Sequence, residues 1–377
     1  MVSKILSPYL KRVLNFSQKL PSLHYYWKEE DQQVSRVTTL SCKYFVNVSV
    51  FIHVAYLIAQ LVALSLSHSS PLEKLQFGGL ITLPVLAVLL IRLEWESSPT
   101  CVQLLNAILN HGRGKDKNET LSPIWLKTIF RLIDFTLLTC PIVFSLMVLI
   151  NPCQLPFIGS LILSPKFCTA SIIAESDNWD FIIINFLVRI ILASFEYLIF
   201  FQITTAAVFQ GMMIPLSGII FLLEKTNRLT THKGKLPLIK YRQLQIFTAV
   251  LNLCIKTRIF PVVAYFAPAA QILSGFVLIV GHASLKMLPY SFMSLEFVEA
   301  VMLNLIVFTG SGKIYVKTSR CLGRLNSEER CTKIGKKTCK SFTPLKLWFG
   351  NNFVDACTTL VIQQFCTCST MNCLLLF

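Results

Sequence analysis

Charged residues are scarce in this sequence. Only 14% of its 377 residues are Asp, Glu, Lys or Arg, whereas 54% are hydrophobic. A soluble domain usually has about a quarter of its residues charged. The deficit therefore argues against an ordinary soluble domain and indicates a membrane protein.

The sequence also lacks the motifs of catalysis and metal binding. Its 6 histidines are scattered, and none has a partner at the spacing of a metal site such as HExxH. The run Gly-Ser-Gly-Lys at 310–313 lacks the upstream glycine of a phosphate-binding loop. We therefore expect no enzyme activity, no metal and no cofactor. We expect His53, in an apolar segment, to be a packing residue rather than to face a cavity.

An apolar signal peptide is missing as well. Residues 1–43 are mixed and charged, without the apolar stretch that such a peptide requires. We therefore expect 1–43 to be a cytosolic N-terminal segment and the first membrane helix to lead insertion.

Seven apolar segments are long enough to span a bilayer, which takes roughly 20 residues each. The sequence thus predicts an all-α integral membrane protein with seven transmembrane helices. The expected spans lie at 44–66, 75–93, 129–150, 181–202 with a cytosolic extension to 223, 259–281, 292–309 and 349–377. A basic cytosolic loop at 310–348 separates the last two spans.

The net charge of +16 follows the connections between these spans. Of 35 Lys and Arg residues, 29 precede residue 44 or lie in the connections 94–128, 224–258 and 310–348, and 3 lie in the alternate connections. Basic loops face the cytosol. The pattern predicts a multi-pass plasma-membrane protein with its N-terminus inside and its C-terminus outside. It also explains the positive charge without a nucleic-acid partner.

The fourth apolar segment, 181–223, is too long for one span. Dividing it into two spans would place two strongly basic loops outside the cell. We therefore expect one long helix whose inner half leaves the bilayer, with Pro215 kinking or ending it. The inner half is apolar, so it must pack against protein.

Charged residues inside the spans are functional candidates, because they are costly in hydrocarbon. Arg131 and Asp134 are three residues apart and can pair on one helix face. Arg189 and Glu196 lie on one face two turns apart. Local pairing within the bundle and a role in ligand binding both fit this pattern.

Two cysteines lie in the long connection 151–180, which the charge pattern places outside. Cys153 and Cys168 can form a disulfide in that oxidising environment. The alternative is two free thiols.

The last segment carries a stripe of small polar side chains. On a helical wheel, Asn351, Asp355 and six later residues fall within about 120° of one another. The later ones are Thr358, Thr359, Cys366, Ser369, Thr370 and Cys373. Ile362 interrupts the stripe, Gln363 borders it, and Gln364 lies on the far side. The stripe fits close packing against another helix or a water path with an apolar gate at Ile362.

The same segment contains a family motif. Gln364-Phe365, preceded by apolar residues and the pair Thr358-Thr359, resembles the signature that closes the last helix of arthropod (insect-type) gustatory and odorant receptors. Seven spans, an inside N-terminus and long basic inner loops are similar to that superfamily as well.

The resemblance implies a function. Members are non-selective cation channels, opened by a small organic tastant or odorant and built as homo- or hetero-tetramers within membrane lipid. Their last helix lines the pore, which implies pore positions at Thr358, Thr359, Ile362, Gln363, Cys366, Ser369 and Thr370. Motif position allows either Val361 or Ile362 as the gate, and the wheel favours Ile362. The inner ends of the last four helices form a cytosolic anchor where subunits meet.

The resemblance also implies a ligand pocket in the outer half of the bundle. Aromatic candidates are Phe135, Phe144, Trp179 and Phe186. Such residues also serve as packing or interface anchors.

Two other functions remain open at this point. A G-protein-coupled receptor also has seven spans, but its N-terminus is outside, and the DRY and NPxxY motifs are missing here. A transporter or membrane enzyme needs charged relays in several spans, and the four charged residues noted above come with no supporting motif.

Overall fold

The computed structural model describes residues 2–68, 74–93, 98–111, 123–164, 179–231, 238–282, 287–327 and 341–376. Within these ranges the chain is predominantly helical, and six helices are long and apolar enough to cross a membrane. A seventh apolar helix, at 81–92, is shorter. The protein is therefore an all-α, multi-pass membrane protein.

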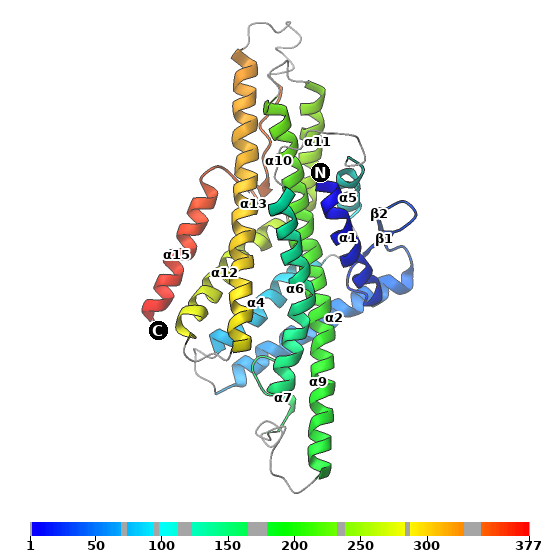
Figure 1. Cartoon of the computed structure of the whole chain (residues 1–377), viewed down its shortest axis with the longest axis vertical. Coiled ribbons are helices and arrows are strands. Elements are labelled where there is room, and N and C mark those ends of the chain that lie inside the picture. Colours follow the sequence, from blue (N-terminus) through cyan, green and yellow to red (C-terminus); the bar gives the residue numbers. More distant parts are fainter. Residues whose placement is uncertain are drawn as a thin grey trace.

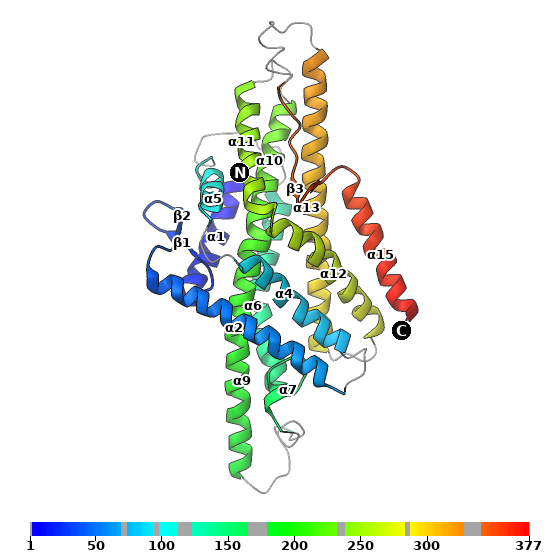
Figure 2. The ribbon, with the colours of Figure 1, turned by 180° about the vertical axis from the view of Figure 1, so that it is seen from behind.

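Seven helices coincide with the seven predicted spans. They are α2 (Leu40–Leu66), α4 (Leu80–Arg92), α6 (Pro123–Ile150), α9 (Trp179–Ala206), α12 (Ile259–Val280), α13 (Met287–Ser327) and α15 (Thr358–Leu376). A π-helical stretch, η1 (Lys74–Gly79), leads into α4. The molecule is elongated, with α9 reaching one end and α13 the other (Figure 1). Helices α2 and α4 cross the long axis obliquely (Figure 2).

The fourth predicted segment is one continuous helical run. Helix α9 passes into the π-helix η2 (Ala207–Met213) and then into α10 (Ile214–Thr231). Pro215 is the second residue of α10, and the wider π turn before it accommodates a residue that has no N–H to donate. The apolar half of this run is buried, including Leu216, Ile219 and Leu222. It packs against α13 and α11 (Leu238–Ile255) of the same chain, as its composition requires.

Helix α13 extends beyond its predicted end at residue 309 and continues to Ser327. Two glycines allow close approach along this extension. A Cβ on Gly312 would lie 2.4 Å from the carbonyl oxygen of Asp355, and one on Gly310 would lie 2.7 Å from Cγ2 of Ile219. The Gly-Ser-Gly-Lys run is therefore a helix-packing feature and not a phosphate-binding loop.

Helix α15 begins at Thr358, nine residues after the predicted start. The short hairpin of β3 (Trp348–Phe349) and β4 (Asn352–Phe353) precedes it. The Asp355 carboxylate accepts hydrogen bonds from the backbone N–H groups of Cys357 and Thr358, at 3.1 and 2.9 Å. It also accepts one from the Thr358 hydroxyl at 2.6 Å, which lowers the pKa of Asp355. These bonds satisfy donors that a helix start leaves free, so the helix begins there.

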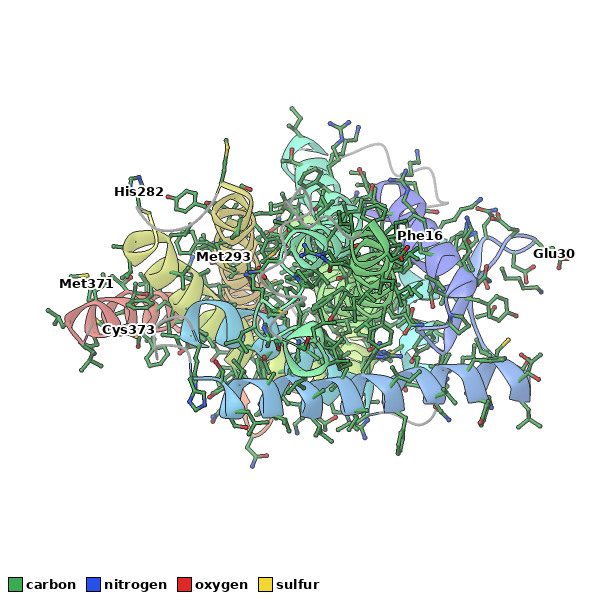
Figure 3. All side chains as sticks on the ribbon, turned by 90° about the horizontal axis from the view of Figure 1, so that it is seen from below. Phe16, Glu30, His282, Met293, Met371 and Cys373 are labelled. Carbon is green, nitrogen blue, oxygen red and sulfur yellow. The ribbon has the colours of Figure 1, made fainter. Side chains whose placement is uncertain are left out.

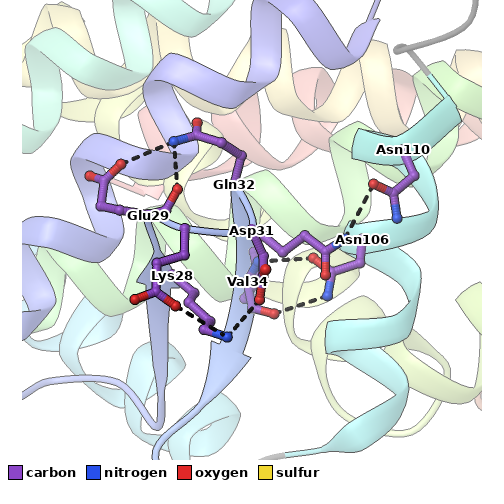
Figure 4. Close-up of polar contacts among 9 residues, drawn as sticks. Lys28, Glu29, Asp31, Gln32, Val34, Asn106 and Asn110 are labelled. Atoms are coloured by element: carbon purple, nitrogen blue, oxygen red, sulfur yellow. Dashed lines mark hydrogen bonds and ion pairs between the residues drawn. The ribbon is translucent and has the colours of Figure 1, made fainter.

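The N-terminal segment is folded against the bundle. Helix α1 (Val2–Lys19) buries Leu6, Leu10 and Leu14, and the hairpin β1 (Tyr25–Lys28) and β2 (Gln33–Arg36) follows it. Asn106 of α5 (Pro99–His111) accepts the Val34 N–H and donates to the Val34 carbonyl, both at 2.9 Å (Figure 4). The amide side chain thereby extends the hairpin's backbone pairing onto α5.

We expect Gly312→Ala to lower the free energy of unfolding by about 1–3 kcal/mol, because the backbone of Asp355 must move to admit the methyl group. Gly323→Ala is the matched control in the same helix, since nothing lies within 4 Å of its Cβ position. That control should be neutral or stabilising by up to about 1 kcal/mol. Thermal unfolding of purified protein in detergent measures both. Equal midpoints for the two variants would contradict the packing interpretation.

Candidate functional site

A cavity of about 230 Å³ lies among five segments of the bundle, namely α4, α6, the α9–η2 run, α12 and α13. Most of its wall is aliphatic or aromatic. Wall residues include Val85, Val88, Ile203, Val208, Val263, Ala267, Ala270 and Leu303. An apolar cavity with a few polar groups is the usual form of a small-molecule site.

One wall of the cavity is aromatic. The Phe144 ring centroid lies 4.1 Å from that of Phe200 and 4.9 Å from that of Phe292, and all three residues line the cavity. Phe157, fully buried just before the short helix α7 (Gly159–Ile162), packs behind them. Four chain segments thus hold these rings in place.

The polar part of the cavity wall is on α13, which brings two carboxyl groups to the cavity. The Thr136 hydroxyl of α6 donates to Oε1 of Glu299. Oε2 of Glu296 is buried and has no hydrogen-bond partner among the residues that the structure describes. Nearby, the Thr204 hydroxyl contacts Sγ of Cys140 at 3.5 Å.

Sequence reasoning missed both carboxyl groups. Glu296 and Glu299 lie inside the predicted span 292–309, so their cost in hydrocarbon was a signal. Their spacing of three residues places them on one helix face, which is the face that meets the cavity.

Three of the four aromatic pocket candidates have side chains that the structure describes, and one of these three lines the cavity. Phe144 does, whereas the side chains of Phe135 and Phe186 are 54% and 48% exposed on the outer surface of the bundle. Trp179 begins α9, and its side chain lies outside the described part. The wheel position of an aromatic residue does not by itself say which side of a helix the bundle covers.

The charged residues of the predicted spans do not pair with one another as expected. Asp134 pairs with Arg12 of α1 instead of Arg131. Glu196 accepts hydrogen bonds from the Tyr56 hydroxyl at 2.5 Å and from the Ile158 N–H at 3.1 Å.

Arg189 donates to Asn185 at 3.2 Å and to the Ile150 carbonyl, at the end of α6, at 3.2 Å. These charged groups therefore tie separate elements together, and none of them lines the cavity.

His53 is fully buried, as expected for a packing residue. Its Nδ1 lies 2.6 Å from the Arg92 guanidinium. That guanidinium also donates to the Ser49 hydroxyl and the Ser22 carbonyl, both at 2.8 Å. The cluster joins α2, α4 and the N-terminal segment.

Cys153 is disulfide-bonded. Its predicted partner, Cys168, lies outside the described residues. The segment that follows Cys153 packs closely, since a Cβ on Gly159 would lie 2.0 Å from the Pro152 carbonyl oxygen.

The polar stripe of α15 faces helices of its own chain. The Thr359 hydroxyl lies 3.3 Å from that of Thr309. The Gln271 side-chain amide donates to the side-chain carbonyl oxygen of Gln363 at 3.0 Å, and the reverse contact is 3.4 Å. Cys366 is buried, with Sγ 3.9 Å from the Pro268 carbonyl oxygen.

The remaining predicted pore positions, Thr358, Ile362, Ser369 and Thr370, are partly buried on this side. The contacts thus favour close helix packing over a water path for the stripe within one chain.

The other face of α15 is exposed. Leu360, Val361 and Phe365 are 73%, 62% and 59% exposed, and Gln364 is exposed with them. Ile362, in contrast, packs against the main hydrophobic core. The two gate candidates therefore point in different directions. Figure 3 shows α15 at one edge of the molecule, with Met371 and Cys373 on it.

Comparisons with known proteins identify the fold. No family model and no curated protein matches the sequence. The structure of the insect olfactory receptor OR5 from Machilis hrabei in complex with eugenol matches with a TM-score of 0.64 and 11% identity, covering 100% of both chains. A second structure of that receptor matches with a TM-score of 0.55 and 10% identity, covering 98% of both.

At this identity the match establishes the fold. The chain has the fold of an insect olfactory receptor, and the sequence-based resemblance to that superfamily agrees with it. The matched protein is a receptor rather than an enzyme.

We expect Phe144→Ala to lower the free energy of unfolding by about 3–5 kcal/mol, because it removes buried ring contacts and enlarges the cavity. Phe135→Ala, in the same helix but on its exposed side, should change it by less than about 0.5 kcal/mol. Thermal unfolding in detergent compares the two. A Phe135→Ala cost as large as that of Phe144→Ala would contradict the assignment of cavity and surface.

Proposed function

We propose that this chain, which has the fold of an insect olfactory receptor, is a subunit of a chemosensory receptor of the gustatory or odorant type. A small organic molecule binds in the cavity among α4, α6, η2, α12 and α13, and it opens a cation-selective path. The subunit works in the plasma membrane as one of four, either identical or related.

The full-length match to a receptor structure that holds eugenol carries this proposal. Fold alone does not fix function, so the cavity is the second support. It is mostly apolar, of a size for a small organic molecule, and lined by elements from five parts of the chain.

Helix α12 lies between the cavity and α15. Val263, Ala267 and Ala270 line the cavity, while Pro268 and Gln271 of the same helix contact α15. A ligand that fits one position of α12 better than another therefore biases the position of α15. Such a difference in affinity is what gating requires.

Helix α13 provides a second route. Glu299 and Leu303 line the cavity, and Asn304 donates to Gln271 at 2.9 Å. One turn farther on, Thr309 reaches Thr359 of α15. Both helices that hold α15 are therefore also cavity walls.

The exposed face of α15 supports a role between subunits. Only 6% of its apolar window is buried within the chain, compared with 28–44% for the other long spans. One helix cannot enclose a pore, but a copy from each of four subunits can. The outward position of Val361 makes it the gate in this proposal, as an apolar constriction that closes by excluding water. Ile362, the position that the wheel favours, serves packing instead.

The proposal differs from its alternatives in topology and transport rate. A G-protein-coupled receptor has an external N-terminus, and a carrier is slow. Epitope tags at both termini of the expressed chain, combined with recordings of ligand-evoked single-channel current, separate the three. An external N-terminal tag, or transport without unitary currents, would contradict the proposal.

We expect Val361→Ser to produce current without ligand, because a hydroxyl at the constriction favours water in the closed pore. Ile362→Ser, one residue away, should leave the closed state tight and reduce the amount of folded receptor, since Ile362 packs inward. Whole-cell recording normalised to surface expression measures both effects. Leak from Ile362→Ser and none from Val361→Ser would restore the gate position that the wheel favours.

A further inference from the structure

We infer that the cavity recognises a small organic cation, namely a protonated amine carried on an apolar body. The inference takes its site from the proposed function and adds the chemical class of the ligand. It depends on the two carboxyl groups of α13.

Among the described residues, Glu296 and Glu299 are the acidic ones in the cavity wall, and no Lys or Arg lines it. Every other described lining residue is apolar except for Thr136, Cys140 and Thr204. A buried carboxyl group is costly unless a counter-charge or hydrogen-bond donors meet it. Within the described part of the chain, one lining side chain, Thr136, donates a hydrogen bond to these two carboxyl groups, whereas the Thr204 hydroxyl donates to Cys140.

The hydrogen bond from Thr136 serves only one of the two carboxyl groups. The Thr136 hydroxyl donates to Glu299, whereas Oε2 of Glu296 is buried without a partner. Other buried side-chain atoms in the described part of the chain also have no partner, but Glu296 is the one such residue that lines the cavity. A buried polar group without a partner is a place where a ligand can supply one. An ammonium group has three N–H donors and a positive charge, which match what the two carboxyl groups lack.

The rest of the wall fits the rest of such a ligand. The ring centroids of Phe200 and Phe292 lie 4.1 and 4.9 Å from that of Phe144. The three rings provide surfaces for an aromatic or aliphatic body. Aromatic rings also attract a nearby cation through their faces. A neutral hydrocarbon of the same shape would bury its apolar part equally well and leave Glu296 without a partner.

Binding to the purified full chain in detergent tests this inference with three probes of one shape, 2-phenylethylamine, 2-phenylethanol and propylbenzene. We expect the amine to bind at least about tenfold more tightly than propylbenzene, because its ammonium group can form charge-assisted hydrogen bonds with the carboxyl groups and propylbenzene can form none. Glu296→Gln should weaken amine binding at least about tenfold and change propylbenzene binding less than about twofold. Glu196→Gln, a buried carboxyl group outside the cavity, is the control and should leave all three affinities unchanged.

Several outcomes would overturn the inference. They are an amine affinity no greater than that of the alcohol, no saturable amine binding up to millimolar concentration, or equal losses in Glu296→Gln and Glu196→Gln. Current recordings separate this from the proposed function. If the amine binds but evokes no current, the ligand inference stands and the channel function is contradicted. If only the neutral probes evoke current, the channel function stands and the ligand inference is contradicted.

Discussion

Polar side chains in the membrane must find partners inside the protein, and the arrangement of this bundle depends on that constraint. Hydrocarbon offers them no hydrogen bonds, so each one selects a neighbour. Arg92 joins α4 to α2 through His53, and Glu196 joins α9 to α2 through Tyr56. Gln271 joins α12 to both α13 and α15. Apolar side chains fill the space between the helices, and these hydrogen bonds connect specific pairs of them.

The same constraint singles out the cavity. Several buried side-chain polar atoms have no hydrogen-bond partner among the described residues, including Nε2 of His53, and Oε2 of Glu296 is the one of them that belongs to a residue of the cavity wall. A ligand group with N–H donors can meet that oxygen. The helices that enclose this group, α12 and α13, are also the ones that hold α15. Two helices, α12 and α13, thus connect the cavity directly to the exposed helix α15, without a long chain of intermediate contacts.

The sequence predicted the segments of the fold well because span length and charge asymmetry are local properties. It located seven apolar helices and identified 181–223 as one helix. The alternative in which Pro215 ends that helix was wrong, because the run continues through Pro215 to Thr231. It was less accurate where packing decides. Helix α13 continues past residue 309 to Ser327, and Gly310 and Gly312 allow Ile219 and the backbone of Asp355 to pack closely against this extension. Helix α15 starts late because Asp355 satisfies its first donors.

Composition and periodicity were by themselves enough to indicate an all-α membrane protein, and the short Gln364-Phe365 motif pointed to the superfamily whose fold the chain has. They also showed that α15 has a polar stripe interrupted by Ile362. Only the tertiary structure decided what that stripe faces, because a helical wheel gives the angle between side chains and not the position of neighbouring helices. The stripe meets α12 and α13, and Val361 points outward. The cavity is likewise a tertiary feature, since residues from five distant segments form its wall.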